Sequence, residues 1–176
     1  MMHWLRKIIE KEKGGYLLSR ASLVKEAIHW GDMDSMRHVN NVVYLKKFGD
    51  ARINYLLGLE KLHNGTNTFL EGTAVGPIMR TAEIQWKFPI TYPDRITVFN
   101  KIDKVDEDRF YLSGILVSHK HQCLASRIKE VEVTVDYTKQ PTAKAPVPDH
   151  WREIFAKEMA AQENWLKEFE ETDLDL

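Results

Sequence analysis

A cluster of polar residues stands directly in front of a helix whose circumference is mostly apolar. Residues 31–41 read GDMDSMRHVNN and combine turn-forming residues with two carboxylates, one imidazole and two carboxamides. The helix is expected from about Val42 to Leu57, with one narrow polar stripe around Lys47 and Asp50. So wide an apolar arc predicts a helix that is covered on several sides. Polar groups at the start of a buried helix are costly unless they are paired or used, so this stretch is the first candidate for a functional site.

The composition excludes several classes of partner. The chain has 176 residues, of which 43% are hydrophobic and 29% charged, as in ordinary globular proteins. A formal net charge of −1 gives no general attraction to nucleic acid or to an anionic membrane, so neither partner is expected. No apolar run approaches the ~20 residues that cross a bilayer, so no membrane span is expected.

The expected location is intracellular. A single cysteine, Cys123, allows no intramolecular disulfide. The first 15 residues are too charged for a secretory signal, and Glu10 and Glu12 weaken a mitochondrial presequence. A cytoplasmic and a mitochondrial location both stay open.

The chain is expected to form one domain with extensions at both ends. An N-terminal segment over residues 1–20 begins with a helix at 3–13, which Gly14 and Gly15 should end. The main domain is expected over 21–138, followed by a proline-rich linker over 139–148. An amphipathic helix is expected over 149–171, with Asp149 as its N-cap.

Alternating apolar residues predict the strands of the main domain. The expected strands are Leu23 to Trp30, a long strand from Thr73 to Phe88, Ile96 to Ile102, Phe110 to Ser118, and Cys123 to Tyr137. In the last of these the apolar parity shifts, which predicts a bulge near Lys129-Glu130. A strand, a helix and then a strand meander indicate the α+β class, with one helix laid over an antiparallel sheet.

The polar stretch also matches a known motif. The matching residues are Asp32, Asp34, His38-Val39-Asn40-Asn41, Tyr44 and Ala51-Arg52. They follow the pattern Asp-x-Asp-x-x-Gly-His-Val-Asn-Asn-x-x-Tyr, and the chain therefore resembles the hotdog-fold acyl thioesterases. The resemblance is to the 4-hydroxybenzoyl-CoA thioesterase-like group and to the acyl-ACP thioesterases, and it covers about Leu23 to Tyr137. It implies a hotdog fold, in which the sheet curls around the central helix. The common glycine of the family is Arg37 here, and the acyl-ACP branch tolerates a side chain at that place.

The resemblance implies hydrolysis of a thioester, acyl-CoA + H2O → carboxylate + CoA-SH, with no cofactor. Asp34 is expected to act as the general base or as the nucleophile. A free N–H at the helix start, at Asn41, is expected to polarise the carbonyl together with the positive end of the helix dipole. Asn40 or Asn41 can serve as the N-cap, and a capping side chain on Asn41 is compatible with its backbone role.

His38 and Asn40 each have two possible roles. His38 could orient water or substrate, as in the acyl-ACP branch, or it could be a loop histidine whose hydrogen bonds are satisfied. Asn40 could position water or hold the loop. Tyr44 and Phe48 are expected to contact the acyl group, and Asp32 is expected to be structural.

Three further groups of side chains have the chemistry of possible ligands. Arg52 falls on the apolar side of the helix, where an internal salt bridge is the expected role. His119, His121 and Cys123 are too few for a closed metal site, so no metal is predicted. The phosphates of CoA would need surface cations, and the candidates are Arg80, Lys87, Arg95 and Lys101.

The expected partners are an acyl-CoA substrate and further copies of the chain. A single hotdog protomer leaves a sheet edge that a second copy can pair with, which predicts a homodimer or homotetramer. In the resembling families the active site lies at the protomer interface. Two alternatives stay open, a non-catalytic hotdog module that binds acyl chains or proteins, and a hotdog hydratase or dehydratase. The carrier is also open between CoA and acyl carrier protein.

Overall fold

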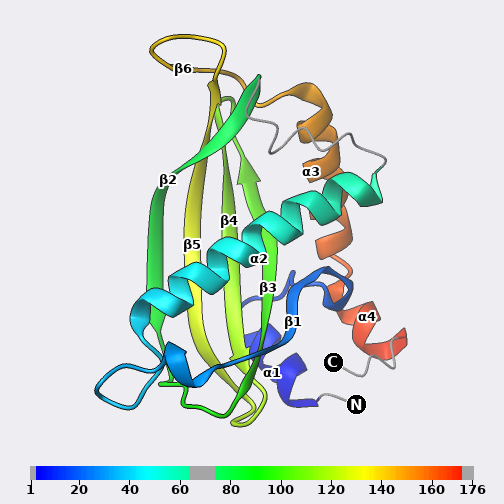
Figure 1. Ribbon diagram of the computed structural model, residues 1–176. Coiled ribbons are helices and arrows are strands. Elements are labelled where there is room, and N and C mark those ends of the chain that lie inside the picture. Colours follow the sequence, from blue (N-terminus) through cyan, green and yellow to red (C-terminus); the bar gives the residue numbers. More distant parts are fainter. Residues whose placement is uncertain (1–2, 64–73, 172–176) are drawn as a thin grey trace.

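An antiparallel sheet curves around one long helix, α2 (Asn41–Leu62), which crosses the strands diagonally (Figure 1). The computed structural model of the protein describes residues 3–63 and 74–171. Within these ranges six strands form the sheet in the order β1-β3-β4-β5-β2, and β6 pairs with β5. This arrangement confirms the predicted α+β class and the hotdog fold.

The remaining elements follow the expected order along the chain. The strands are β1 (Ala21–Ala27), β2 (Val75–Trp86), β3 (Arg95–Val105), β4 (Arg109–Ser118), β5 (Cys123–Asp136) and β6 (Ala143–Lys144). The helices are α1 (His3–Lys11), α3 (Asp149–Gln162) and α4 (Trp165–Glu171), with two short 3-10 turns, η1 (Leu18–Arg20) and η2 (Trp30–Asp32).

Several predicted boundaries differ from the observed ones, and the first strand, expected over Leu23 to Trp30, ends at Ala27. Helix α2 continues to Leu62, beyond the expected end at Leu57. The expected strand start at Thr73 lies outside the described residues. The predicted helix over 149–171 is divided into α3 and α4. Pro148 occupies the N-cap of α3, so the prediction that Asp149 is the cap is wrong, and Asp149 is the first helical residue.

The concave face of the sheet packs closely on α2. Phe48 and Ala51 of α2 are fully buried against a core that includes Leu116 and Ile128. Fully burying a side chain of this kind stabilises the fold by about 1.5–3 kcal/mol. A Cβ at Gly114 would lie 2.9 Å from the Ile128 side chain and 3.2 Å from the Phe48 ring. Glycine is therefore the residue that allows the strand and the helix to approach this closely.

Helix α3 extends the core at the far end of α2. Trp151 and Phe155 pack in one cluster with Tyr55 and Leu59 of α2. Gln162 accepts a hydrogen bond from the Ile102 N–H (2.9 Å) and donates one to the Ile102 carbonyl (2.8 Å). Ile102 lies beyond the end of the β1 pairing, so the glutamine replaces a missing strand partner. This contact explains why a polar residue interrupts the apolar stripe of the helix.

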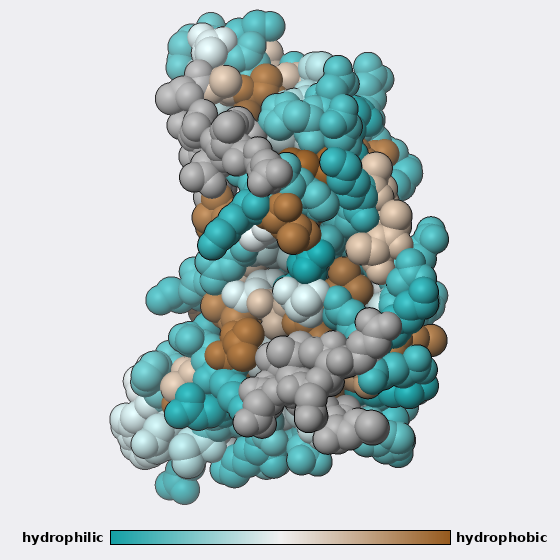
Figure 2. Space-filling view, turned by 90° about the vertical axis from the view of Figure 1, so that its right-hand side faces the viewer, coloured by the Kyte–Doolittle hydropathy of each residue, from teal (hydrophilic) through white to brown (hydrophobic). Residues whose placement is uncertain are grey.

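The convex face of the sheet is covered by the two ends of the chain. Leu5 and Ile9 of α1 and Phe169 of α4 form one cluster with Phe99 and Ile115 of the sheet. Both faces of the central strands are therefore buried. Figure 2, viewed from the side of α3 and α4, shows hydrophilic residues over most of this surface and hydrophobic ones in separate patches.

The predicted bulge near Lys129-Glu130 is wrong. Both residues pair in unbroken register with Ser113 and Leu112 of β4. The register shifts that involve β5 lie elsewhere. One is between Met79 and Thr81 of its neighbour β2, and the other is on β5 itself, opposite Leu116 and Val117 of β4. The apparent shift of parity arises because Glu130 and Glu132 occupy inward positions, where they are 2% and 3% exposed.

Candidate active site

Residues 32–40 form a narrow loop that leads into α2. Met33 and Val39 form an isolated antiparallel bridge, and the Asn40 N–H donates to the Asp32 carbonyl at 2.9 Å. The Val39 N–H donates to the Ile90 carbonyl, also at 2.9 Å, and this bond ties the loop to the β2–β3 connection. The loop is thus held from both sides at the start of the helix.

Asp34 lies in this loop with one carboxylate oxygen engaged. Its Oδ1 accepts from the Met36 N–H at 2.8 Å and from the His38 N–H at 3.4 Å. The second oxygen, Oδ2, accepts no hydrogen bond from any residue in the described part of the chain. The turn contact and a chemical role are therefore compatible, because each uses a different oxygen.

Arg37 adopts a backbone conformation that favours glycine. Its φ angle is +63°, in the left-handed region. A side chain at such a position costs about 1–2 kcal/mol, which glycine avoids. The geometry explains why the family pattern has glycine at this place, and the exposed arginine fills the same turn.

Asn40 and Asn41 have different positions at the helix start. The Asn40 Oδ1 accepts from the Val42 N–H at 3.0 Å, so Asn40 is the N-cap. The expectation that the Asn41 side chain caps the helix is therefore wrong, because Asn41 is already the first helical residue. Its backbone N–H is among the helix-start donors that have no intrahelical partner, and it donates to no other described residue.

The side chains of His38 and Asp32 differ in whether they form hydrogen bonds within the loop. His38 is exposed, and within the described ranges only its backbone is hydrogen-bonded. The Asp32 Oδ2 accepts from the His29 N–H at 2.8 Å, which agrees with the structural role expected for Asp32.

The family model of the thioesterase-like superfamily matches residues 28–155, well over half of the chain. The chain belongs to the thioesterase-like superfamily. The matched region contains the whole 32–40 loop, α2 and the sheet from β2 to β5. The predicted enzyme class, a thioester hydrolase, is confirmed at the level of the family.

Solved structures agree with this assignment. The PA2801 protein of Pseudomonas aeruginosa, described as a candidate thioesterase, is 26% identical with a TM-score of 0.60, and the match covers 73% of this chain and 92% of that one. A candidate acyl-CoA thioesterase of Xanthomonas campestris is also 26% identical, with a TM-score of 0.52 and coverages of 62% and 88%. The DHNA-CoA thioesterase of Staphylococcus aureus is 17% identical, with a TM-score of 0.64 and coverages of 78% and 90%, and it supports the fold alone. Among curated proteins no significant match was found.

In this thioesterase-like protein, Tyr44 and Phe48 lie inside the hydrophobic core. The Tyr44 hydroxyl accepts from the Ile90 N–H at 3.0 Å and donates to the Phe88 carbonyl at 3.4 Å. Burial raises the pKa of Tyr44, so the hydroxyl stays protonated. Phe48 has no exposed surface. The contact of these two residues with an acyl group stays a prediction.

Arg52 forms the internal ion pair that its buried position predicts. Its guanidinium lies 2.6 Å from Glu130 Oε1 and 3.3 Å from Glu132 Oε1, both on β5. Burial raises the pKa of Glu130, and burial with the neighbouring Glu130 raises the pKa of Glu132 to about 7 against the lowering effect of Arg52. Sequence reasoning found the arginine but missed both acids, which are more than 70 positions away and interrupt the apolar pattern of their strand.

His119, His121 and Cys123 have separate environments. The His119 Nε2 lies 2.7 Å from the Thr97 hydroxyl, and burial lowers the pKa of this histidine. The His121 ring packs on Phe88 with the ring centroids 4.7 Å apart. In residues 3–63 and 74–171 no three histidine, cysteine or acidic side chains are grouped to hold a metal ion.

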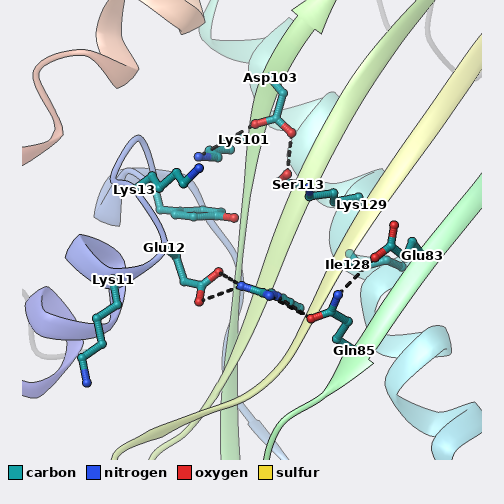
Figure 3. A pocket seen from close by; sticks show the side chains of 12 residues that line it. Lys11, Glu12, Lys13, Glu83, Gln85, Lys101, Asp103, Ser113, Ile128 and Lys129 are labelled. Carbon is teal, nitrogen blue, oxygen red and sulfur yellow. Dashed lines mark hydrogen bonds and ion pairs between the residues drawn. The ribbon is translucent and has the colours of Figure 1, made fainter.

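A polar cavity of about 430 Å³ lies under α1, on the convex face of the sheet (Figure 3). The Arg127 guanidinium bridges Glu12 (3.0 Å) and Gln85 (2.8 Å). The Ser113 hydroxyl donates to Asp103. These groups largely satisfy one another, and the cavity is on the opposite side of the sheet from α2, so it is not part of the candidate active site.

Among the described helices, none combines the length and apolar character that a bilayer crossing requires.

Proposed function

We propose that this protein hydrolyses an acyl-CoA thioester to the free acid and CoA, with its chemistry at the start of α2. The observation that carries the proposal is the Asn41 N–H, a donor with no described partner at the start of a 22-residue helix. The adjoining loop presents an Asp34 oxygen that is also unengaged. Membership of the thioesterase-like superfamily supports the same reaction.

The proposed reaction uses Asp34 as the general base. Asp34 Oδ2 accepts a proton from a water molecule as the water oxygen attacks the thioester carbonyl carbon. The carbonyl π electrons move to oxygen and form a tetrahedral oxyanion. When the carbonyl re-forms, the C–S bond breaks, and the CoA sulfur leaves as a thiolate that takes up the proton held by Asp34, which regenerates the base.

The backbone of Asn41 is proposed to stabilise the oxyanion. A donor of this kind is worth about 10²–10³ in rate, because it is aimed at charge that develops in the transition state. The positive end of the α2 dipole acts in the same direction. Asn40 supports this arrangement because its side chain satisfies the Val42 N–H, which fixes the first turn.

Replacing Asn41 with proline tests the backbone donor. Proline is well tolerated at the first helical position, and the extended Asn40 backbone (φ −57°, ψ 137°) suits a residue that precedes proline. We expect kcat to fall about 100- to 1000-fold with little change in the melting temperature. Asn41→Ala, which keeps the N–H, should retain most of the activity and is the matched control. Equal activity of the two variants would rule out the backbone role.

A thiol-release assay over straight-chain acyl-CoA lengths and an aryl-CoA tests the function as a whole. Hydrolysis of at least one member is expected, with release of one thiol per turnover. Loss of enoyl absorbance without thiol release would point to a hydratase. A protein that binds the substrates without turning any of them over would contradict the proposal in favour of a binding module.

We propose that the working form contains at least two copies of the chain. Strand β2 is an edge of the sheet and exposes Ile78, Met79 and Trp86. Beside it, α2 exposes Val42 at 70%. An unpaired apolar edge is a liability that symmetric pairing with a second copy removes. We expect light scattering to give the mass of two or four chains, and the mass of one chain would contradict this prediction.

A further inference from the structure

An open groove lies at the end of the sheet next to the candidate active-site loop. Its volume is about 530 Å³. Three segments line it, which are the end of β1 through His29, the β2–β3 connection at residues 92–95, and the β4–β5 turn at His119 and Lys120.

Two exposed aromatic rings stand at the edge of this groove, where Tyr92 belongs to the lining and Trp30 packs on Tyr92 from just outside it. Trp30 is 76% exposed and Tyr92 is 46% exposed. Their ring centroids are 5.8 Å apart and the rings are nearly perpendicular, at 88°. In such an edge-to-face pair the edge of one ring meets the face of the other, and the exposed fractions show that both rings keep surface that a ligand can contact. Large aromatic side chains grouped at the surface next to a groove indicate a binding surface for an apolar or planar group.

The rim of the groove is positively charged. Neither Arg95 nor Lys120 has a carboxylate partner among the described residues. The one acid that lines the groove, Asp94, is buried and accepts three hydrogen bonds, from the Arg95 N–H (2.7 Å), the Lys120 N–H (3.0 Å) and the Ser118 hydroxyl (2.5 Å). Its charge is therefore turned inward. Arg95 and Lys120 are exposed, and although the Arg95 guanidinium donates to the Lys25 carbonyl at 3.0 Å, both cations keep donors that suit phosphate groups.

The groove is adjacent to the candidate active-site loop. Trp30 opens the 3-10 turn η2, which ends at Asp32, two residues before Asp34. The Tyr92 N–H lies 3.3 Å from the Met33 sulfur, so the β2–β3 connection contacts the loop directly. A ligand in the groove would thus lie beside the loop that carries the proposed base.

We propose that this groove binds the nucleotide end of CoA, with the adenine on the Trp30–Tyr92 pair and its phosphates on Arg95 and Lys120. The inference rests on the proposed function in one respect, that the acyl carrier is CoA. Stacking on an aromatic ring suits any flat base, and the cations match the 3′-phosphate and the diphosphate. An acyl carrier protein offers no adenine, so an adenine platform selects CoA as the carrier.

Calorimetric titration with adenosine 3′,5′-bisphosphate tests the groove without any turnover. Stacking of one base is worth about 5- to 150-fold in affinity, so Trp30→Ala should raise the Kd at least 5-fold. Lys120→Ala should raise it by a similar factor, and this change keeps the backbone N–H that Asp94 uses. The matched controls are Leu166→Ala and Lys167→Ala on α4, which should bind like the wild type. No binding by the wild type at millimolar nucleotide, or the same Kd in all variants, would overturn the proposal.

Steady-state kinetics with two thioester substrates distinguish a failure of this inference from a failure of the proposed function. In Trp30→Ala, the KM for acyl-CoA should rise while the KM for the acyl N-acetylcysteamine thioester, which lacks the nucleotide, stays unchanged. An equal loss with both substrates would show that Trp30 only supports the loop and would overturn the groove proposal. Nucleotide binding that depends on Trp30 in a protein without hydrolytic activity would support the groove and contradict the proposed function.

Discussion

Replacing Asp34 with asparagine should lower kcat for acyl-CoA hydrolysis by about 10²- to 10⁴-fold, the usual contribution of a general base. Asparagine keeps the Oδ1 acceptor for the Met36 and His38 N–H groups, so the turn should survive. It replaces the unengaged Oδ2 with an amide group that cannot take a proton from water. The loss should appear in kcat more than in KM, because the base acts in the transition state.

Asp32→Asn is the matched control for Asp34→Asn. Asp32 lies in the same loop, but its Oδ2 accepts from the His29 N–H and has a structural role. We expect Asp32→Asn to change kcat by less than about 10-fold, since a single loop hydrogen bond is worth about 0.5–1.5 kcal/mol. Thiol-release kinetics and thermal melts on both variants separate chemistry from folding. An unchanged rate in Asp34→Asn would eliminate Asp34 as the base.

Replacing Arg52 with methionine should lower the free energy of unfolding by about 3–5 kcal/mol at pH 8. The change removes the positive charge beside Glu130 and Glu132, which are almost completely buried. One carboxylate oxygen on each of them already lacks a hydrogen bond among the described residues, Glu130 Oε2 and Glu132 Oε1. Two adjacent buried carboxylates with no counter-charge are strongly unfavourable.

The loss in Arg52→Met should be smaller at pH 5 than at pH 8. The pKa of Glu132 is about 7 in the folded protein, above the ordinary value of 4.5. Between these two values the folded state binds more protons than the unfolded state, so this carboxyl lowers stability as the pH rises. Without Arg52 the effect that lowers both pKa values is lost, so both carboxyls hold their protons to higher pH and the penalty of two buried charges shrinks as the pH falls.

Urea unfolding at pH 5 and pH 8, at one fixed protein concentration, measures the effect. The control is Arg6→Met, because Arg6 forms an exposed pair with Glu10 at 2.9 Å. Such surface pairs contribute about 0–1 kcal/mol, so this variant should resemble the wild type at both pH values. A loss below 1 kcal/mol in Arg52→Met, or the same loss at both pH values, would contradict the prediction.

The sequence predicted the helix and the order of strands because those signals are local. The apolar arc after Val42 and the alternation in the strands each depend on neighbours within a few residues. The motif from Asp32 to Asn41 is also contiguous, so the loop and the helix start could be located. Arg52 could be assigned an ion pair because an arginine on an apolar helix face needs a counter-charge.

Which residues contact one another depended on the packing of segments that are distant in the sequence. Glu130 and Glu132 interrupt the pattern of β5, and their inward direction follows from an unbroken register with β4. The choice of Asn40 as the N-cap followed from its extended backbone geometry, which a pair of adjacent asparagines does not specify. Tyr92 reads in the sequence as part of a turn, and its pairing with Trp30 joins two connections that are 62 residues apart.

The polar stretch in front of α2 thus combines features that the local sequence determines with features that only the tertiary structure determines. Its residue types, spacing and helix-start chemistry are properties of a short segment, and they identify the superfamily and the candidate base. Which Asp34 oxygen is free, which asparagine caps, and which aromatic and basic groups lie beside the loop follow from the packing of β1, the β2–β3 connection and the β4–β5 turn around it. Side-chain direction and long-range pairing are set by that packing, because local preferences of about 1 kcal/mol per residue are readily outweighed by burial and hydrogen bonding.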